Sequence, residues 1–109
     1  MACIDFTLKS ISIDYTPSNT DVVISVETNT ATASVEITLP LAYGEAGRLL
    51  VIKDGGGNAS TNNILVSPQS PDTMDGKNSL LMQTDYGSVF LIATGSTAAS
   101  AGWALVSMV

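Results

Sequence analysis

Apolar and polar residues alternate along most of this chain, which is the pattern of strands with one buried face. The longest example covers residues 31–39, where every second position from Ala31 is apolar and the intervening positions are Thr, Ser or Glu. Pro40 follows and cannot donate a ladder hydrogen bond, so it predicts the end of that strand or an edge position. No segment keeps a 3.6-residue apolar period over ten residues. The sequence therefore predicts an all-β fold.

About eight or nine short strands are expected, at the spacing typical of a sandwich or barrel. The alternation slips by one position between Leu8 and Ile11, which predicts a bulge or bend between two short strands. Turn-forming residues separate most of the others. The fold prediction is an antiparallel β-sandwich, jelly-roll-like or barrel-like domain. Its expected strands are residues 4–8, 11–15, 22–26, 31–39, 49–52, 64–66, 80–82, 88–93 and 103–108.

Residues 49–66 combine two apolar runs with a connection made almost entirely of turn-forming residues. The first run, Leu49–Ile52, is apolar at successive positions, which predicts a central strand or one covered by another subunit. The connection, Lys53–Asn63, contains three consecutive glycines. This arrangement predicts a β-hairpin-like unit that joins two buried strands, with the glycines present for backbone shape.

The glycine-rich segment Asp54–Asn58 is also a candidate ligand loop, because oxygen ligands on such a loop can hold calcium. A phosphate cradle would need a following Gly-Lys-Ser/Thr and a helix, and the sequence has neither. A turn whose Asp and Asn side chains bond to their own backbone explains the same residues and is the favoured interpretation. The same interpretation applies to Asp72–Gly76. No catalytic, cofactor-binding or metal-binding residue is therefore assigned.

The chain has no histidine, which removes Ser-His-Asp and Cys-His triads and the common zinc ligand sets. Ten acidic residues leave a paired-carboxylate glycosidase formally open, but no two acids are flanked by aromatic residues suited to stacking a sugar. The protein is therefore predicted not to be an enzyme and to need no cofactor. Cys3, the single cysteine, is interpreted as a small apolar residue rather than a reactive thiol or interchain bridge, because no cation lies near it in sequence.

Two further motifs have ordinary structural explanations. Asn58-Ala59-Ser60 matches a glycosylation sequon, but without a secretory signal we interpret it as a chance match. Trp103 heads an alternating terminal run, so we expect it in the core or in a subunit contact rather than in a binding site.

The charge distribution excludes several partners. The net charge is −6, and four scattered basic residues cannot supply the clustered cations that nucleic acid or an anionic membrane requires. Charged residues make up 13% of the chain, about half the usual share, and 25 serines and threonines replace them. Such a surface suits proteins that pack against copies of themselves, as well as extracellular β-proteins.

No apolar run approaches the roughly 20 residues that span a bilayer. The N-terminus lacks a signal peptide, so synthesis in the cytoplasm is expected.

An ordered series of short motifs resembles a β-domain of tailed-bacteriophage virion structural proteins, which include capsid decoration (cement), head-fibre and tail-fibre proteins. The series covers roughly residues 35–109. Met74 departs from it, because isoleucine is usual there, and so does the Ala- and Ser-rich loop before Trp103. The matching motifs are Ile37-Thr38-Leu39-Pro40, Tyr43-Gly44, Gly47-Arg48, the Lys53–Asn63 connection, Asp72–Gly76, Tyr86-Gly87-Ser88-Val89, Gly95 and Gly102-Trp103-Ala104-Leu105.

The resemblance implies a homotrimer located in the virion. Leu49–Ile52 and Val89–Ile92 are the expected trimer-building strands, because both are apolar on both faces. The leading hypothesis is a decoration protein that binds the major capsid protein, with residues 31–109 as the β-domain and residues 1–30 as a gripping arm. One alternative is a tail-fibre or spike module that binds host glycans, for which Tyr43 and Tyr86 are the candidate aromatic residues. The other is a tail or neck adaptor.

Overall fold

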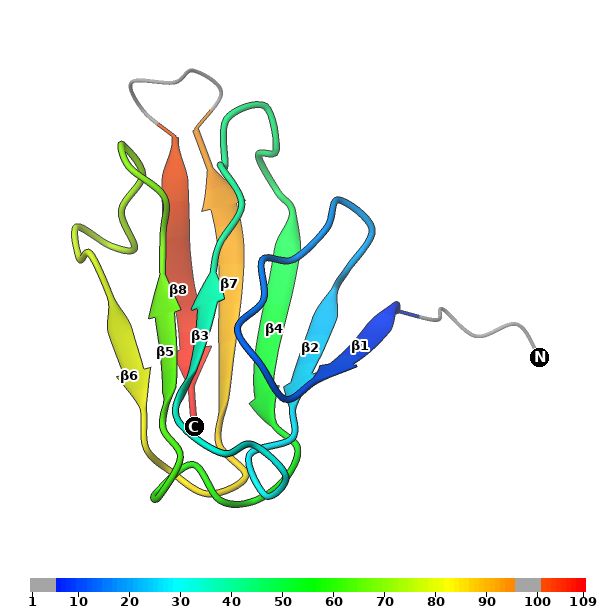
Figure 1. The fold of residues 1–109 in the computed structure, drawn as a ribbon. Coiled ribbons are helices and arrows are strands. Elements are labelled where there is room, and N and C mark those ends of the chain that lie inside the picture. The colour runs from blue at the N-terminus through cyan, green and yellow to red at the C-terminus, as the bar shows by residue number, and fades with distance from the viewer. Residues whose placement is uncertain (1–5, 96–100) are drawn as a thin grey trace.

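The computed structural model describes residues 6–95 and 101–109, which form eight strands and no helix (Figure 1). None of the described residues therefore belongs to a helix that could cross a membrane. The all-β prediction and the expected number of strands are confirmed. The strands are β1 (Leu8–Ile11), β2 (Val23–Val26), β3 (Val35–Thr38), β4 (Leu49–Asp54), β5 (Ile64–Ser67), β6 (Leu80–Met82), β7 (Ser88–Thr94) and β8 (Gly102–Met108).

The strands form two sheets that pack face to face. The larger sheet has the order β1-β2-β4-β7-β8, and the smaller one has the order β3-β5-β6. Figure 1 shows the smaller sheet in front of the larger one, and neither sheet closes into a barrel. One apolar core lies between them and draws on both sheets. Its fully covered members include Ile24, Val26, Ile37, Leu50, Ile52, Ile64, Val66, Val89, Leu91 and Trp103.

Both sheets are mixed, and this corrects the prediction of an antiparallel domain. β1 pairs with β2, β2 with β4, and β3 with β5, all in parallel register, whereas β4–β7, β7–β8 and β5–β6 are antiparallel. β1 and β2 are consecutive strands of the larger sheet, joined by residues 12–22, whereas the β2–β4 and β3–β5 pairs are parallel because the chain alternates between sheets from β2 to β5. Each connection reverses the chain direction but also crosses to the other sheet, so the in-sheet neighbour is the strand two positions along (Figure 1).

The predicted hairpin at residues 49–66 is also wrong. β4 lies at the centre of the larger sheet between β2 and β7, which confirms the prediction of a central strand, but β5 belongs to the smaller sheet. Residues 55–63 are therefore a corner that carries the chain from one sheet to the other. The apolar runs identify both strands, but they do not show whether the two strands pair with each other.

The N-terminal strands differ from the expected ones. β1 spans the predicted slip rather than ending at it, and the segment after it contacts β3 of the smaller sheet through the bridge between Tyr15 and Ile37 and through the Asp14 side chain. Residues 31–34 precede β3 without being part of it. Ile24 and Val26 of β2 are completely buried in the common core, so β2 belongs to the same packed unit as residues 31–109. Residues 1–5, including Cys3, lie outside the described residues.

Trp103 lies in the core, and its environment supports the packing interpretation. It is 2% exposed, and its Nε1 donates to the carbonyl of Pro40 at 3.1 Å. This bond joins the start of β8 to the segment after β3, and it satisfies the polar group that a buried indole carries.

The core predicts a clear contrast between two leucines. Leu50 is fully buried on β4, whereas Leu81 on β6 is 45% exposed. We expect Leu50→Ala to lower the free energy of unfolding by about 2–5 kcal/mol, because it removes buried methyl groups and leaves a cavity. Leu81→Ala should change it by less than about 1 kcal/mol. Urea unfolding curves measure both, and similar losses would contradict the two-sheet core.

Candidate functional site

The Asp54 carboxylate, at the end of β4, is the centre of the glycine-rich corner. The Asp54 side chain is fully buried and accepts four hydrogen bonds. Oδ1 accepts from the Thr28 hydroxyl at 2.5 Å and from the Gly57 N–H at 3.0 Å. Oδ2 accepts from the N–H groups of Ala59 and Tyr86, each at 3.0 Å. An ionised carboxylate offers about four lone-pair sites, so none is left for a metal ion.

Thr28 extends this network toward the loop after β2. Its hydroxyl donates to Asp54 and also accepts the Asn58 N–H at 2.8 Å. The Asn62 side-chain amide then donates to the carbonyls of Thr28 and Ala31, at 3.0 and 2.9 Å. The corner is therefore tied on both sides to residues 28–31, which lead into β3. The bonds between Asp54 and the Gly57 and Ala59 N–H groups are the local turn bonds that the favoured interpretation predicted, whereas Thr28 and Tyr86 are distant partners that it did not include.

The three glycines of the corner are required mainly because other groups approach them closely. A Cβ on Gly56 would lie 2.6 Å from the backbone nitrogens of Thr28 and Asn29. A Cβ on Gly57 would overlap the Tyr86 ring, and this glycine also has a φ of +73°, which glycine adopts without strain. The glycines therefore serve backbone shape, as expected, but the neighbouring chain contributes as much to that requirement as the turn does.

The second candidate loop, residues 72–76, has the same structural character. The Asp72 side chain accepts the Ala42 N–H at 2.8 Å, and the Asp75 side chain accepts the Leu105 N–H at 3.2 Å. Asp75 and Gly76 have φ values of +48° and +80°, as in a tight turn. The described residues contain no group of three or more His, Cys, Asp or Glu side chains placed to hold a metal ion.

All six aspartates within the described residues accept a backbone N–H group. Asp14 accepts from Glu36, Asp21 from Ser18, and Asp85 from Ser60, in addition to the three aspartates described above. Five of the six reach across 22 or more residues of sequence; Asp21 bonds locally. Apart from Asp21, the described aspartates therefore connect segments that are distant in the sequence.

Two of these carboxyls titrate below their usual range. Burial raises the pKa of Asp54, but the hydrogen bonds from Thr28 and from three backbone amides lower it by more. Burial likewise raises the pKa of Asp21, and hydrogen bonds from the Tyr15 hydroxyl and from Ser18 outweigh that effect. The Tyr15–Asp21 bond also raises the pKa of the Tyr15 phenol.

The two candidate aromatic residues for glycan binding lie at opposite ends of the sandwich. Tyr43 is in the loop before β4, whose first residue, Leu49, pairs with Ile92 near the end of β7. Tyr86 precedes the start of β7. Both side chains are exposed, at 58% and 62%. The Tyr86 ring has the Lys53 ammonium 5.7 Å from its centroid, and Lys53 also donates to the Tyr86 carbonyl. The two tyrosines therefore do not form a joint stacking surface.

The outer face of the larger sheet carries an apolar area that we call the outer patch. Leu50, Ile52, Val89 and Leu91 point into the core, so the alternate residues of β4 and β7 point outward. The register places the apolar ones among these outward residues in two adjacent rows across the strands. The next row, Ser25, Lys53 and Ser88, is polar and carries the Lys53 charge. The outer patch consists of Leu8, Val23, Val51 and Phe90 in one row, and Leu49, Ile92 and Ala104 in the other.

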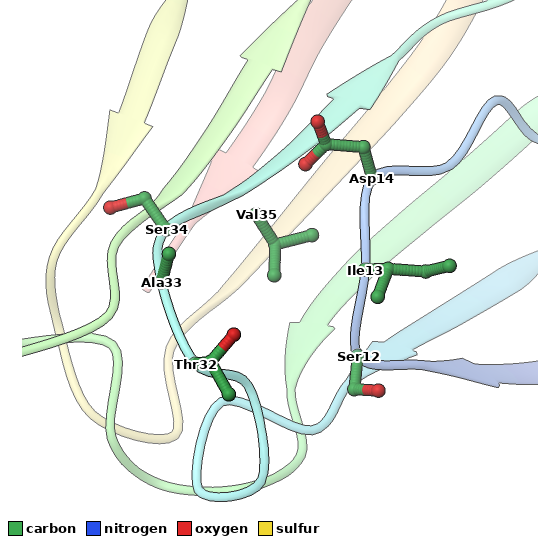
Figure 2. A pocket seen from close by; sticks show the side chains of 7 residues that line it. All are labelled: Ser12, Ile13, Asp14, Thr32, Ala33, Ser34 and Val35. Carbon is green, nitrogen blue, oxygen red and sulfur yellow. The ribbon is translucent and has the colours of Figure 1, made fainter.

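A cavity of about 380 Å³ opens between the segment after β1 and the segment before β3. Figure 2 shows that Asp14 and Val35 point into the space between the two segments, whereas Ile13 and Ser34 point away from it. The other lining residues are Ser12, Thr32 and Ala33. We call this cavity the β3 slot. Sequence reasoning missed it because residues 11–15 and 31–39 both alternate like complete strands.

Comparison with known proteins adds no family to this description. The chain matches no protein-family model, and a search of the curated proteins found no match.

The four bonds to Asp54 predict a large effect from a nearly isosteric change. Asp54→Asn replaces one acceptor oxygen with a donor amide that faces N–H or O–H groups, so buried donors lose their partner. We expect the free energy of unfolding to fall by about 3 kcal/mol. Asp85 is an exposed carboxylate that accepts one backbone N–H, so Asp85→Asn should lower the free energy of unfolding by less than about 1 kcal/mol. Equal losses in denaturant titrations would show that the network does not stabilise the corner.

The lowered pKa values of Asp54 and Asp21 predict acid sensitivity. A carboxyl whose pKa is lower in the folded protein contributes stability that is present above its unfolded pKa and is lost as the pH falls through the folded pKa. Unfolding free energy should therefore stay level above about pH 5 and decrease steadily below about pH 4. Measured between pH 7 and pH 2, Asp54→Asn should show a shallower decrease than the parent protein. An unchanged acid slope would contradict the role given to this carboxylate.

Proposed function

We propose that this protein is a bacteriophage virion structural protein, namely a capsid decoration protein that assembles into a homotrimer and binds the outer surface of the shell. The observation that carries the proposal is the outer patch. Such a contiguous apolar area on a soluble domain marks an interaction surface. Its function would be mechanical, because apolar area buried between subunits resists expansion of the shell.

A second copy of the chain is the partner that fits the outer patch. The chain carries a net charge of −6, so two copies repel each other wherever acidic surfaces meet. The outer patch contains no acidic residue, and Phe90, on β7 between β4 and β8, is 39% exposed. Large aromatic residues in the middle of a contact contribute strongly to association. The strands expected to build the trimer are adjacent and contribute their outward residues to this patch. These strands are Leu49–Ile52 and Val89–Ile92.

The assignment to a virion is supported by the ordered motifs in residues 35–109. Several occupy positions that shape the domain. Asp54 and the glycines form the corner, Asp72 fixes the loop at Ala42, and Trp103 closes the core onto Pro40. The motif series therefore includes residues that shape this fold, and its resemblance to motifs of virion proteins is the basis of this part of the proposal.

The competing roles have less support. A glycan-binding fibre tip would be favoured by aromatic residues gathered on one surface, but Tyr43 and Tyr86 are at opposite ends of the sandwich. A neck or tail adaptor would also use an oligomeric interface, so the outer patch does not separate it from a decoration protein. The number of copies in the particle distinguishes these roles, because a shell carries many equivalent sites and a neck or a set of fibres carries few.

Copy number therefore tests the proposed role. Quantitative mass spectrometry of purified phage particles should find hundreds of copies of this chain for each particle. A few tens of copies or fewer would contradict the decoration role and favour a fibre or neck component. If excess free protein blocked adsorption of the phage to its host, the receptor-binding role would replace it.

The outer patch makes a separate prediction about self-association. Phe90→Glu places a charge among the apolar residues of the patch, and we expect it to weaken subunit association at least tenfold, or by about 1.4 kcal/mol. Because Phe90 points away from the core, the fold should be retained. Leu41→Glu changes an apolar residue that is 47% exposed in a loop and should leave association unchanged. Sedimentation equilibrium measures both, and an oligomer that survives Phe90→Glu would exclude the patch as the interface.

A further inference from the structure

The β3 slot is a place where a strand pairing begins and then stops. Tyr15 pairs with Ile37 in parallel: the Tyr15 N–H donates to the Glu36 carbonyl, and the Thr38 N–H donates to the Tyr15 carbonyl, both at 3.1 Å. Continuing this register backward would place Ile13 opposite Val35. The two segments instead separate, because residues 12–14 lead back to β1 in the larger sheet (Figure 2).

The separation leaves backbone groups of the smaller sheet unpaired. Residues two apart on an extended strand present their N–H and C=O groups to the same side. Ser34 therefore presents its groups toward the slot, as Glu36 does. On the opposite wall Ser12 and Ile13 form a bend, so the strand-like backbone there ends near Tyr15. Among the described residues, neither Ser34 nor Ile13 has a backbone hydrogen-bond partner. An exposed strand edge of this kind is a template for an additional strand.

Asp14 shows how the pairing ends and gives the slot its charge. Its Oδ1 accepts the Glu36 N–H at 2.8 Å and so takes the position that a backbone carbonyl would occupy in a continued ladder. Asp14 is the only charged residue among the seven that line the slot, so the opening carries an uncompensated negative charge. Val35, 2% exposed, forms an apolar floor.

We propose that the β3 slot binds an extended, positively charged segment of a partner protein, which pairs as an added strand with the backbone at Ser34. The backbone ladder would give affinity, Val35 would contact an apolar side chain, and Asp14 would favour a basic neighbour. Under the proposed function this partner is the capsid subunit, and to that extent the inference rests on that function. The slot would then be the place where residues 12–14 of the predicted gripping arm contact the shell.

A defined peptide tests the slot without the natural partner. A labelled peptide of sequence Lys-Val-Lys-Val-Lys-Val should bind in fluorescence anisotropy titrations and should shift the amide NMR signals of residues 12–14 and 32–36. The same peptide with N-methylated backbone amides keeps its charge but cannot form the ladder, and it should bind about tenfold more weakly. The corresponding Glu-Val peptide should also bind more weakly.

Two protein variants test the role of Asp14. Asp14→Asn can still accept the Glu36 N–H but loses the charge, so binding of the Lys-Val peptide should weaken about threefold. Asp75→Asn is the matched control, because Asp75 also accepts one backbone N–H and lies outside the slot lining. It should leave binding unchanged.

Several results would overturn the inference. Equal binding of the N-methylated or acidic peptide would exclude an added strand or a basic partner, and so would equal effects of the two variants. Signal shifts confined to other residues would exclude the site. Self-association that weakens with Asp14→Asn would identify a second copy as the occupant. Any of these results would leave the copy number unchanged, so failure of the slot is distinguishable from failure of the decoration role.

Discussion

The hydrogen bonding of Asp54 is the interaction on which the rest of the structure depends. Its carboxylate stands where β4 ends, and its four donors come from three separate parts of the chain: the loop after β2, the corner itself and the loop before β7. Burying a charge without partners is costly, and the complete set of donors offsets that cost. Because β4 and β5 lie in different sheets, this carboxylate fixes the point at which the chain leaves one sheet for the other. A different set of partners would change the position of β5 relative to the core.

The crossing between sheets explains features that otherwise look unrelated. Alternation of β2, β3, β4 and β5 between the sheets makes in-sheet neighbours parallel, and parallel strands need long connections that cross from layer to layer. The connection from β1 to β2, which begins and ends in the larger sheet, passes the edge of β3, pairs there at Tyr15 and returns, which produces the β3 slot. The larger sheet has five strands and the smaller one covers only its inner face. Within the outer patch of the single chain, Leu8 is 63% and Phe90 39% exposed, whereas Val51 is 8% exposed.

The pattern of apolar, polar and glycine residues predicted the positions of the strands and of the corner, because neighbouring residues in the sequence determine them. Seven of the eight strands fall within or next to the runs marked by alternation, the central position of β4 follows from its apolar residues on both faces, and the corner was identified from its glycines and Asp54. Pairing was not predictable in the same way, because the apolar run Leu49–Ile52 fits a strand of a hairpin and a strand that leads to the other sheet equally well. The partners of Asp54, Thr28 and Tyr86, lie 26 and 32 residues away, and nothing in their immediate sequence marks them. The β3 slot forms where residues 12–14 separate from the segment before β3, and the alternation of apolar and polar residues does not predict that point.

The distribution of charge connects the two proposed contacts. Acidic side chains are numerous, but each described aspartate is engaged with a backbone amide, so most of the negative charge lies in loops and at strand ends. This leaves the outer patch without charge, which suits contact between identical chains, and leaves Asp14 at the mouth of the β3 slot, which suits a basic partner. A decoration protein needs both kinds of contact at once, one to its own copies and one to the shell. Because the patch and the slot belong to different sheets, occupation of one does not require the same residues as occupation of the other.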